Sequence, residues 1–231
     1  MQSIKTLASI FIFFIVIFIS LFAETEIFAA DVAPPDNPPG GSLNPSQQTF
    51  VQMMSEEVII DIPATLSPDM NFIRIDADFE MYNHGDNEEV MQVRFPMSEP
   101  NGSGNGYGGY PKIESIVVQV DGESVLTTIV TSTNPLSVDD PDILWAAFDV
   151  VFPPKDTVVI DVSYNARPSI YYPFARVGYI LETGAGWYDV INSADVIVRL
   201  PFEADRFLFD RDSYSTGVIE GEEIRWPLGT I

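Results

Sequence analysis

Apolar and polar residues alternate with a period of two along most of the chain after residue 50. The clearest run extends from Phe72 to Tyr82, where every second residue from Ile73 is apolar and the residues between are mostly charged. This pattern places one face of a strand in a core and the other face in water. Comparable runs occur at 57–62, 90–95, 113–120, 125–131, 143–152, 157–164, 177–181, 194–200, 206–209 and 223–226.

These runs predict an all-β fold, because no apolar repeat of period 3.6 is sustained after residue 50. About ten short strands separated by turn residues are typical of an antiparallel β-sandwich. We therefore expect an immunoglobulin-like or jelly-roll-like sandwich, preceded by an N-terminal signal or anchor helix.

Turn residues predict how neighbouring strands connect. Asp121-Gly122 is a strong hairpin dipeptide between 113–120 and 125–131. The segment 83–87 (NHGDN) predicts a second hairpin, which would join Phe72–Tyr82 to the run at 90–95.

The stretch Tyr179–Leu200 combines two apolar runs with a Gly-rich turn that carries Trp187 and Tyr188. It predicts a third hairpin, between 177–181 and 194–200. In such a turn Trp187 either packs under the sheet or contributes to a binding surface, and we favour packing.

The first thirty residues differ from the rest of the chain. After Lys5, the segment Leu7–Ala23 is uncharged, as in a signal peptide or an uncleaved N-terminal anchor. Residues 31–49 are rich in Pro and Gly and are interpreted as a linker. We expect the β-sandwich domain to span 50–231 and, because the chain stops just after a predicted strand, to be truncated at its C-terminus. The leader predicts an exported protein, extracellular or in the cell envelope.

Charge and composition exclude several classes of function. The chain has 34 acidic and 11 basic residues, a formal net charge of −23. Such a surface repels phosphate backbones and anionic lipids, so we expect no nucleic-acid partner and membrane contact only through an uncleaved N-terminal segment. The chain also contains no cysteine, which excludes disulfides and thiol catalysis.

The sequence contains few elements of catalytic chemistry. His84 is the only histidine, so zinc sites and histidine-based triads are poorly supported, and we interpret it as a solvated turn residue. The strand acids Asp76, Asp78 and Glu80 are interpreted as a solvated face rather than a catalytic pair. We therefore expect a protein that is not an enzyme.

One acidic loop could bind a metal. Asp139, Asp140 and Asp142 provide three carboxylates, the oxygen ligands that Ca²⁺ prefers. Their spacing matches no EF-hand, and an Asx-rich turn explains the same residues. Calcium is thus a candidate cofactor, with a simple turn as the favoured interpretation.

Loop aromatics are the candidate binding residues. Tyr107, Tyr110, Trp187 and Tyr188 lie in or beside predicted loops, where sandwich folds place binding residues. Aromatic faces stack on sugar rings, while loop carboxylates and amides supply directional hydrogen bonds. A carbohydrate or an envelope protein is therefore the expected partner.

Several motifs resemble a group of exported bacterial all-β domains of unknown function. The residues that carry the resemblance are EEVIIDI (56–62), NHG (83–85), VRFP (93–96), YILETGAGW (179–187), INSAD (191–195) and Leu200-Pro201. The resemblance covers about residues 50–231. It implies an all-β fold and an envelope or extracellular location, and it transfers no catalytic residues.

We therefore expect an exported, non-enzymatic β-sandwich module of a bacterial cell envelope or secreted protein, which binds or scaffolds through loop aromatics. Two alternatives are a purely structural spacer domain of a larger envelope protein and a carbohydrate-active hydrolase that uses loop carboxylates.

Overall fold

The computed structural model describes residues 49–64, 72–97, 113–132, 143–166, 169–171, 174–176, 179, 186–205 and 217–230. Every element formed by these residues is a β-strand, which confirms the predicted all-β class. The predicted leader (1–30) and nearly all of the linker (31–49) lie outside the described residues. Within the described ranges, no helix has the length and apolar character that a membrane crossing requires.

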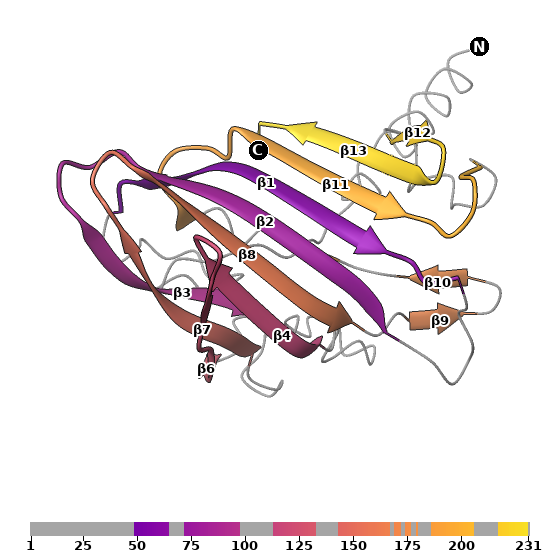
Figure 1. Ribbon diagram of the computed structural model, residues 1–231, viewed down its shortest axis with the longest axis horizontal. Coiled ribbons are helices and arrows are strands. Elements are labelled where there is room, and N and C mark those ends of the chain that lie inside the picture. Colours follow the sequence, from indigo (N-terminus) through magenta and orange to yellow (C-terminus); the bar gives the residue numbers. More distant parts are fainter. Residues whose placement is uncertain are drawn as a thin grey trace, which may run out of the picture.

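The described residues form thirteen strands arranged in two main sheets and a small ribbon (Figure 1). They are β1 (Val51–Asp61), β2 (Ile73–Asn83), β3 (Glu89–Pro96), β4 (Ile113–Val120), β5 (Glu123–Val125), β6 (Thr128–Ser132), β7 (Ile143–Phe152), β8 (Thr157–Ala166), β9 (Ser169–Tyr171), β10 (Phe174–Arg176), β11 (Ser193–Arg199), β12 (Val218–Glu220) and β13 (Glu223–Gly229).

The larger sheet has eight strands in the order β12-β13-β11-β1-β2-β8-β4-β5. Its neighbours are antiparallel except β1 and β11, which run parallel. The smaller sheet has three strands in the order β3-β7-β6, and β9 pairs with β10 as a separate ribbon. The long strands β1, β2 and β8 cross the middle of the molecule, and β3 and β7 lie at the lower left of the view, beyond β8 (Figure 1).

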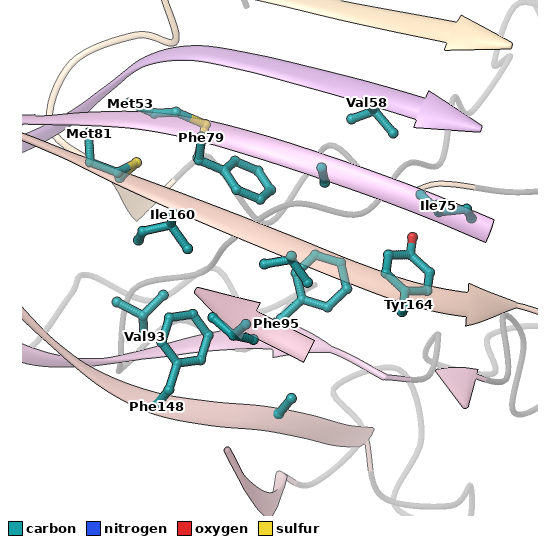
Figure 2. Close-up of a cluster of buried hydrophobic side chains, with 14 of the residues drawn as sticks. Met53, Val58, Ile75, Phe79, Met81, Val93, Phe95, Phe148, Ile160 and Tyr164 are labelled. Atoms are coloured by element: carbon teal, nitrogen blue, oxygen red, sulfur yellow. The ribbon is translucent and has the colours of Figure 1, made fainter. Parts of the chain in front are cut away.

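The two main sheets share one hydrophobic core. Figure 2 shows Phe95 of β3 and Phe148 of β7 in the same cluster as Phe79 and Tyr164 of the larger sheet. The ring centroids of Phe95 and Tyr164 are 5.3 Å apart, a normal contact distance for an aromatic pair. The alternation in the sequence therefore has the expected origin, because the buried positions of the two sheets meet face to face.

The hairpin predicted between 72–82 and 90–95 is wrong. β2 pairs with β1 on one side and β8 on the other, so both of its edges are occupied. β3 instead pairs with β7 in the smaller sheet, and the turn after Asn83 carries the chain from one sheet to the other. Alternation shows which residues face the core, but it does not show which strand is the neighbour.

The hairpin predicted at Asp121-Gly122 is confirmed between β4 and β5. Both turn residues have positive φ angles, 50° at Asp121 and 78° at Gly122, as a type I′ turn requires. The predicted strand that follows, 125–131, is divided, because β5 ends at Val125 and β6 joins the smaller sheet.

The hairpin predicted within Tyr179–Leu200 is also wrong. β11 lies between β1 and β13, with hydrogen bonds to both, so no edge remains for the 177–181 run. Tyr179 is described outside any strand, and the rest of that run lies outside the described residues. The last predicted strand, at 223–226, is confirmed as part of β13.

Candidate binding site

The structure describes two of the predicted site residues, Trp187 and Tyr188. The other predicted site residues lie outside the described residues: Tyr107, Tyr110, Asp139, Asp140 and Asp142. The calcium site therefore stays a prediction. Among the described residues, no group of three or more His, Cys, Asp or Glu side chains is arranged to hold a metal ion.

Trp187 is part of the core. Its side chain is buried, and its ring meets that of Phe152 edge to face at a centroid distance of 6.1 Å. The next residue is fastened to β1, because the Tyr188 backbone N–H donates to the Val51 carbonyl at 2.9 Å. Trp187 thus anchors this segment, and Tyr188 is the member of the pair that presents a ring to solvent.

Tyr188 belongs to a group of four rings at one end of the larger sheet. Its centroid lies 5.8 Å from that of Phe50 and 5.5 Å from that of His84, whose ring also meets Tyr82 at 4.6 Å. Phe50 and Tyr188 are exposed at 49% and 40% of their surface, and His84 and Tyr82 are half-buried. We call Phe50, Tyr82, His84 and Tyr188 the His84 aromatic surface.

The His84 ring is held by a buried amide. Gln52 is 5% exposed, and its Nε2 donates to the Val190 carbonyl at 2.7 Å and to Asn192 Oδ1 at 3.2 Å. These bonds orient the amide so that its Oε1 faces His84 Nε2 at 2.7 Å. Because Oε1 can only accept, Nε2 carries the hydrogen, and in the neutral imidazole Nδ1 is an acceptor.

The interpretation of His84 as a merely solvated turn residue is therefore wrong. Its backbone is fixed as well as its ring: the N–H donates to the Phe50 carbonyl at 2.8 Å, and Lys155 Nζ donates to its carbonyl at 2.6 Å. Gln52 is 32 residues away in sequence. No local pattern marks that pairing, so sequence reasoning could not find it.

The neighbouring turn depends on close packing. Asn83 is fully buried, and its side chain donates to the Phe152 carbonyl and accepts from the Gly85 N–H. A Cβ at Gly85 would lie 2.9 Å from Asn83 Oδ1 and 3.4 Å from Phe50 Cβ. A side chain there would press on both, so glycine allows Phe50 to lie close to this turn.

A row of carboxylates crosses the outer, solvent-facing side of the larger sheet. Asp195, Glu57, Asp78 and Asp161 lie at paired positions on β11, β1, β2 and β8. Arg225 forms an ion pair with Asp195 at 2.7 Å. Partial burial raises the pKa of Asp78 to about 6, aided by the charge and hydrogen bond of Asp161 and by the charge of Glu57.

Asp76, which lies beside Arg74, shows the opposite pKa shift from Asp78. Burial alone would raise the pKa of Asp76, but hydrogen bonds from Arg74 and Ser163 outweigh it and lower the pKa. Arg74 Nη2 lies 2.6 Å from Asp76 Oδ1. The prediction that Asp76, Asp78 and Glu80 face water agrees with their position on this outer side of β2.

A single acid lies on the inner side of the same sheet. Glu56 is 1% exposed, and its Oε1 accepts a hydrogen bond from the Tyr179 hydroxyl at 2.8 Å. Among the residues that the structure describes, its Oε2 has no hydrogen-bond partner, and neither has the buried hydroxyl of Tyr164. Sequence reasoning missed this residue, although two consecutive acids in an alternating strand, Glu56 and Glu57, require that one of them face the core.

Comparison with known proteins shows a fold likeness and no family. No model of a known family matches the chain, and no curated protein is similar to it. The chain is similar to the crystal structure of a Legionella pneumophila protein whose name gives nutrient binding as a suggested role. That match has 19% identity and a TM-score of 0.63, and covers 87% of this chain and 68% of the other. An M1 zinc metallopeptidase from Deinococcus radiodurans matches at 14% identity and a TM-score of 0.38, over 81% of this chain and 41% of the peptidase.

Proposed function

We propose that this protein is an exported, non-enzymatic β-sandwich module that binds carbohydrate through the His84 aromatic surface. The uncharged leader supports export. Two sheets packed on one core support a sandwich. The nutrient-binding role suggested for the Legionella protein agrees with a small ligand.

One observation carries the proposal. The solvent-exposed rings of Phe50 and Tyr188 are in contact beside His84, and the orientation of the His84 ring is fixed by its hydrogen bond with Gln52. Phe50 and Tyr188 offer apolar faces on which the C–H groups of a sugar ring can stack. His84 Nδ1 offers an acceptor for a sugar hydroxyl, because Nε2 is bound to Gln52. A surface with apolar faces and a few oriented polar groups is typical of small-ligand sites.

The ring spacing favours a flat ligand over a caged cation. In an aromatic cage a cation lies between rings, within about 6 Å of their centroids. Here Tyr188 is in direct contact with both Phe50 and His84, at 5.8 and 5.5 Å, so no space remains between them. A ligand would lie across the outer faces of the rings, as a sugar does.

The proposal is tested by screening the folded domain against a panel of soluble glycans, with calorimetry on each glycan that is retained. Tyr188→Ala and Phe50→Ala should each weaken binding by about tenfold or more, the scale of one lost aromatic contact. Phe202→Ala is the matched control, because Phe202 is 48% exposed but lies outside the aromatic surface.

The alternatives give different results in the same assay. A domain that retains no glycan would contradict the proposal and favour the structural spacer. Turnover of a bound glycan that is lost when single carboxylates are changed would favour the hydrolase.

A further inference from the structure

The smaller sheet ends in a strand that lacks the usual protection of a sheet edge. Among the described strands, β6 pairs with β7 alone, so its other side is a free edge. Its sequence, TIVTS, contains no charged residue and no proline. Charges and prolines normally keep a further strand from pairing at an edge. The other edge strands of the two main sheets all carry charge: β3 (Glu89 and Arg94), β5 (Glu123) and β12 (Glu220).

The side chains beside this free edge are open to solvent. Ile129 lies on the core-facing side of the smaller sheet, because it pairs with Ala146, which is fully buried in the core. Ile129 is nevertheless 57% exposed, so the core does not extend beneath β6. Leu126, two residues before the strand, is 94% exposed. The edge therefore presents apolar surface as well as unpaired backbone.

The position of β6 is fixed from its other side. Val130 pairs with Trp145 of β7, and the two side chains pack together in a small apolar cluster. Trp145 is almost fully buried, so this contact holds β6 against the sheet. A strand that is already ordered costs less conformational entropy when it binds a partner. The backbone N–H and C=O groups of the free edge are thus preorganised to pair with an added strand.

The size of the edge argues against a second copy of this chain as the added strand. A stable dimer buries roughly 800 Å² on each partner. β6 has only five residues, and pairing two such strands falls well short of that area. A second copy would also bring another formal charge of −23. Both considerations favour a short segment of a different protein.

The charge near the edge indicates which kind of segment is attracted. Asp149 is exposed on β7, two residues beyond Ala147, the partner of Thr128. Glu123 is exposed on β5, shortly before β6 in the chain. Arg94, the cation of the described strands in this sheet, lies on β3 at the opposite edge. Together with the net charge of −23, these positions favour a basic partner.

We propose that the free edge of β6 is a strand-addition site, which takes an extended, basic segment of another protein with β-branched residues. Main-chain hydrogen bonds to β6 supply the affinity, and alternate side chains of the segment contact Ile129 and Leu126. The site shares no residue with the His84 aromatic surface. It therefore does not depend on the proposed carbohydrate function.

The proposal is tested by fluorescence polarisation with a trace of the labelled synthetic peptide KTVTVTVK, whose β-branched residues favour an extended strand. The full chain should bind it about tenfold or more tightly than the acidic peptide ETVTVTVE, and added salt should reduce the difference. Ile129→Lys places a charge on the edge and should weaken binding of KTVTVTVK by about tenfold or more. Val218→Lys makes the same change on the edge strand β12 and is the matched control, with binding expected to stay within about twofold of the native value.

Amide hydrogen exchange shows where the peptide binds. The β6 amides that face the free edge should gain protection when KTVTVTVK is added, and those of β12 should not. A native chain that does not bind KTVTVTVK, or equal binding by Ile129→Lys, would overturn the proposal. So would self-association in sedimentation equilibrium that Ile129→Lys abolishes, because a second copy would then occupy the edge. None of these outcomes depends on whether a glycan binds.

Discussion

Glu56 and Glu57 are consecutive residues of β1, yet they lie in opposite environments. Glu56 points into the core and, within the described part of the chain, accepts one hydrogen bond, from Tyr179. Glu57 lies on the outer side, paired with Asp78 and Asp195 in a row of carboxylates. The same type of side chain is thus buried in the core at one position and exposed on the outer side at the next, because successive residues of a strand face opposite sides.

Trp187 and Tyr188 repeat this contrast in a turn. Trp187 packs on Phe152 in the core, whereas Tyr188 lies on the surface against Phe50 and His84. In both pairs we expect the inner residue to have the larger effect on the free energy of unfolding, while the outer residue is accessible for other contacts. Changing each member separately should therefore separate stability from binding.

The largest effect on the free energy of unfolding is expected from Trp187, in comparison with its neighbour Tyr188. Trp187→Ala removes a buried ring and should lower the free energy of unfolding by about 3–5 kcal/mol. Tyr188→Ala removes a half-exposed ring and should cost less than about 1 kcal/mol. Urea unfolding at pH 6 measures both. Equal losses would show that the two rings are not divided between core and surface.

Glu56 and Glu57 should differ in how much each makes the free energy of unfolding depend on pH. The pKa of Glu56 is raised to about 7 in the folded state, from an ordinary value of 4.5. The unfolded state therefore loses its proton first, and stability falls as pH rises from about 4.5 to 7 and levels off above. Glu56→Gln should remove a fall of about 3 kcal/mol, at 1.36 kcal/mol per pKa unit.

Glu57→Gln is the control for this experiment and should leave most of the fall in place. The difference between native protein and Glu56→Gln isolates one group from other carboxylates that titrate, such as Asp76 and Asp78. Denaturant unfolding of the native protein and of both variants, each at pH 5 and pH 8.5, gives the six free energies that this comparison needs. If the fall persists in Glu56→Gln, the buried acid is not its source.

A third change removes the support beneath the aromatic surface. Gln52→Met keeps the length of the side chain but deletes the amide that binds His84, Val190 and Asn192. We expect a loss of about 1–3 kcal/mol in unfolding free energy, because buried polar partners lose their bonds. The His84 ring signals in NMR should also broaden or move, and unchanged signals would show that Gln52 does not orient the ring.

The smallest effect on the free energy of unfolding is expected for Asp78, on the outer side of the larger sheet. Asp78→Asn removes a carboxylate that faces Glu57 and Asp161 across the sheet. Because the folded pKa of Asp78 is raised to about 6, its ionisation weakens the fold at higher pH. The variant should gain up to about 1 kcal/mol at pH 8 and little at pH 4. Thermal unfolding at both values checks this, and a larger gain at pH 4 would contradict it.

Local patterns predicted the parts of this fold that depend on neighbouring residues. The alternation from Phe72 to Tyr82 identified β2 and its wet face, and Asp121-Gly122 identified a hairpin because its two positive φ angles are a property of the turn itself. Neither pattern identifies a distant partner. The choice of β1 and β8 as neighbours of β2 depends on packing over the whole chain.

The candidate site was predictable only in part for the same reason. Tyr188 was identified as a loop aromatic, but its neighbours Phe50 and His84 come from the ends of other strands. Glu56 and Tyr179 are 123 residues apart, and nothing near either residue indicates their bond. Residue type and local turn chemistry thus identified a member of the site, while its assembly required the structure.

The most direct test of the account uses His84 itself. It is the only histidine, so its imidazole NMR signals need no assignment by mutagenesis. We predict an Nε2–H tautomer, and we expect a glycan retained by the domain to shift the Hδ2 and Hε1 signals in step with binding measured by calorimetry. A glycan that binds by calorimetry while both His84 signals stay unchanged would contradict the proposed site.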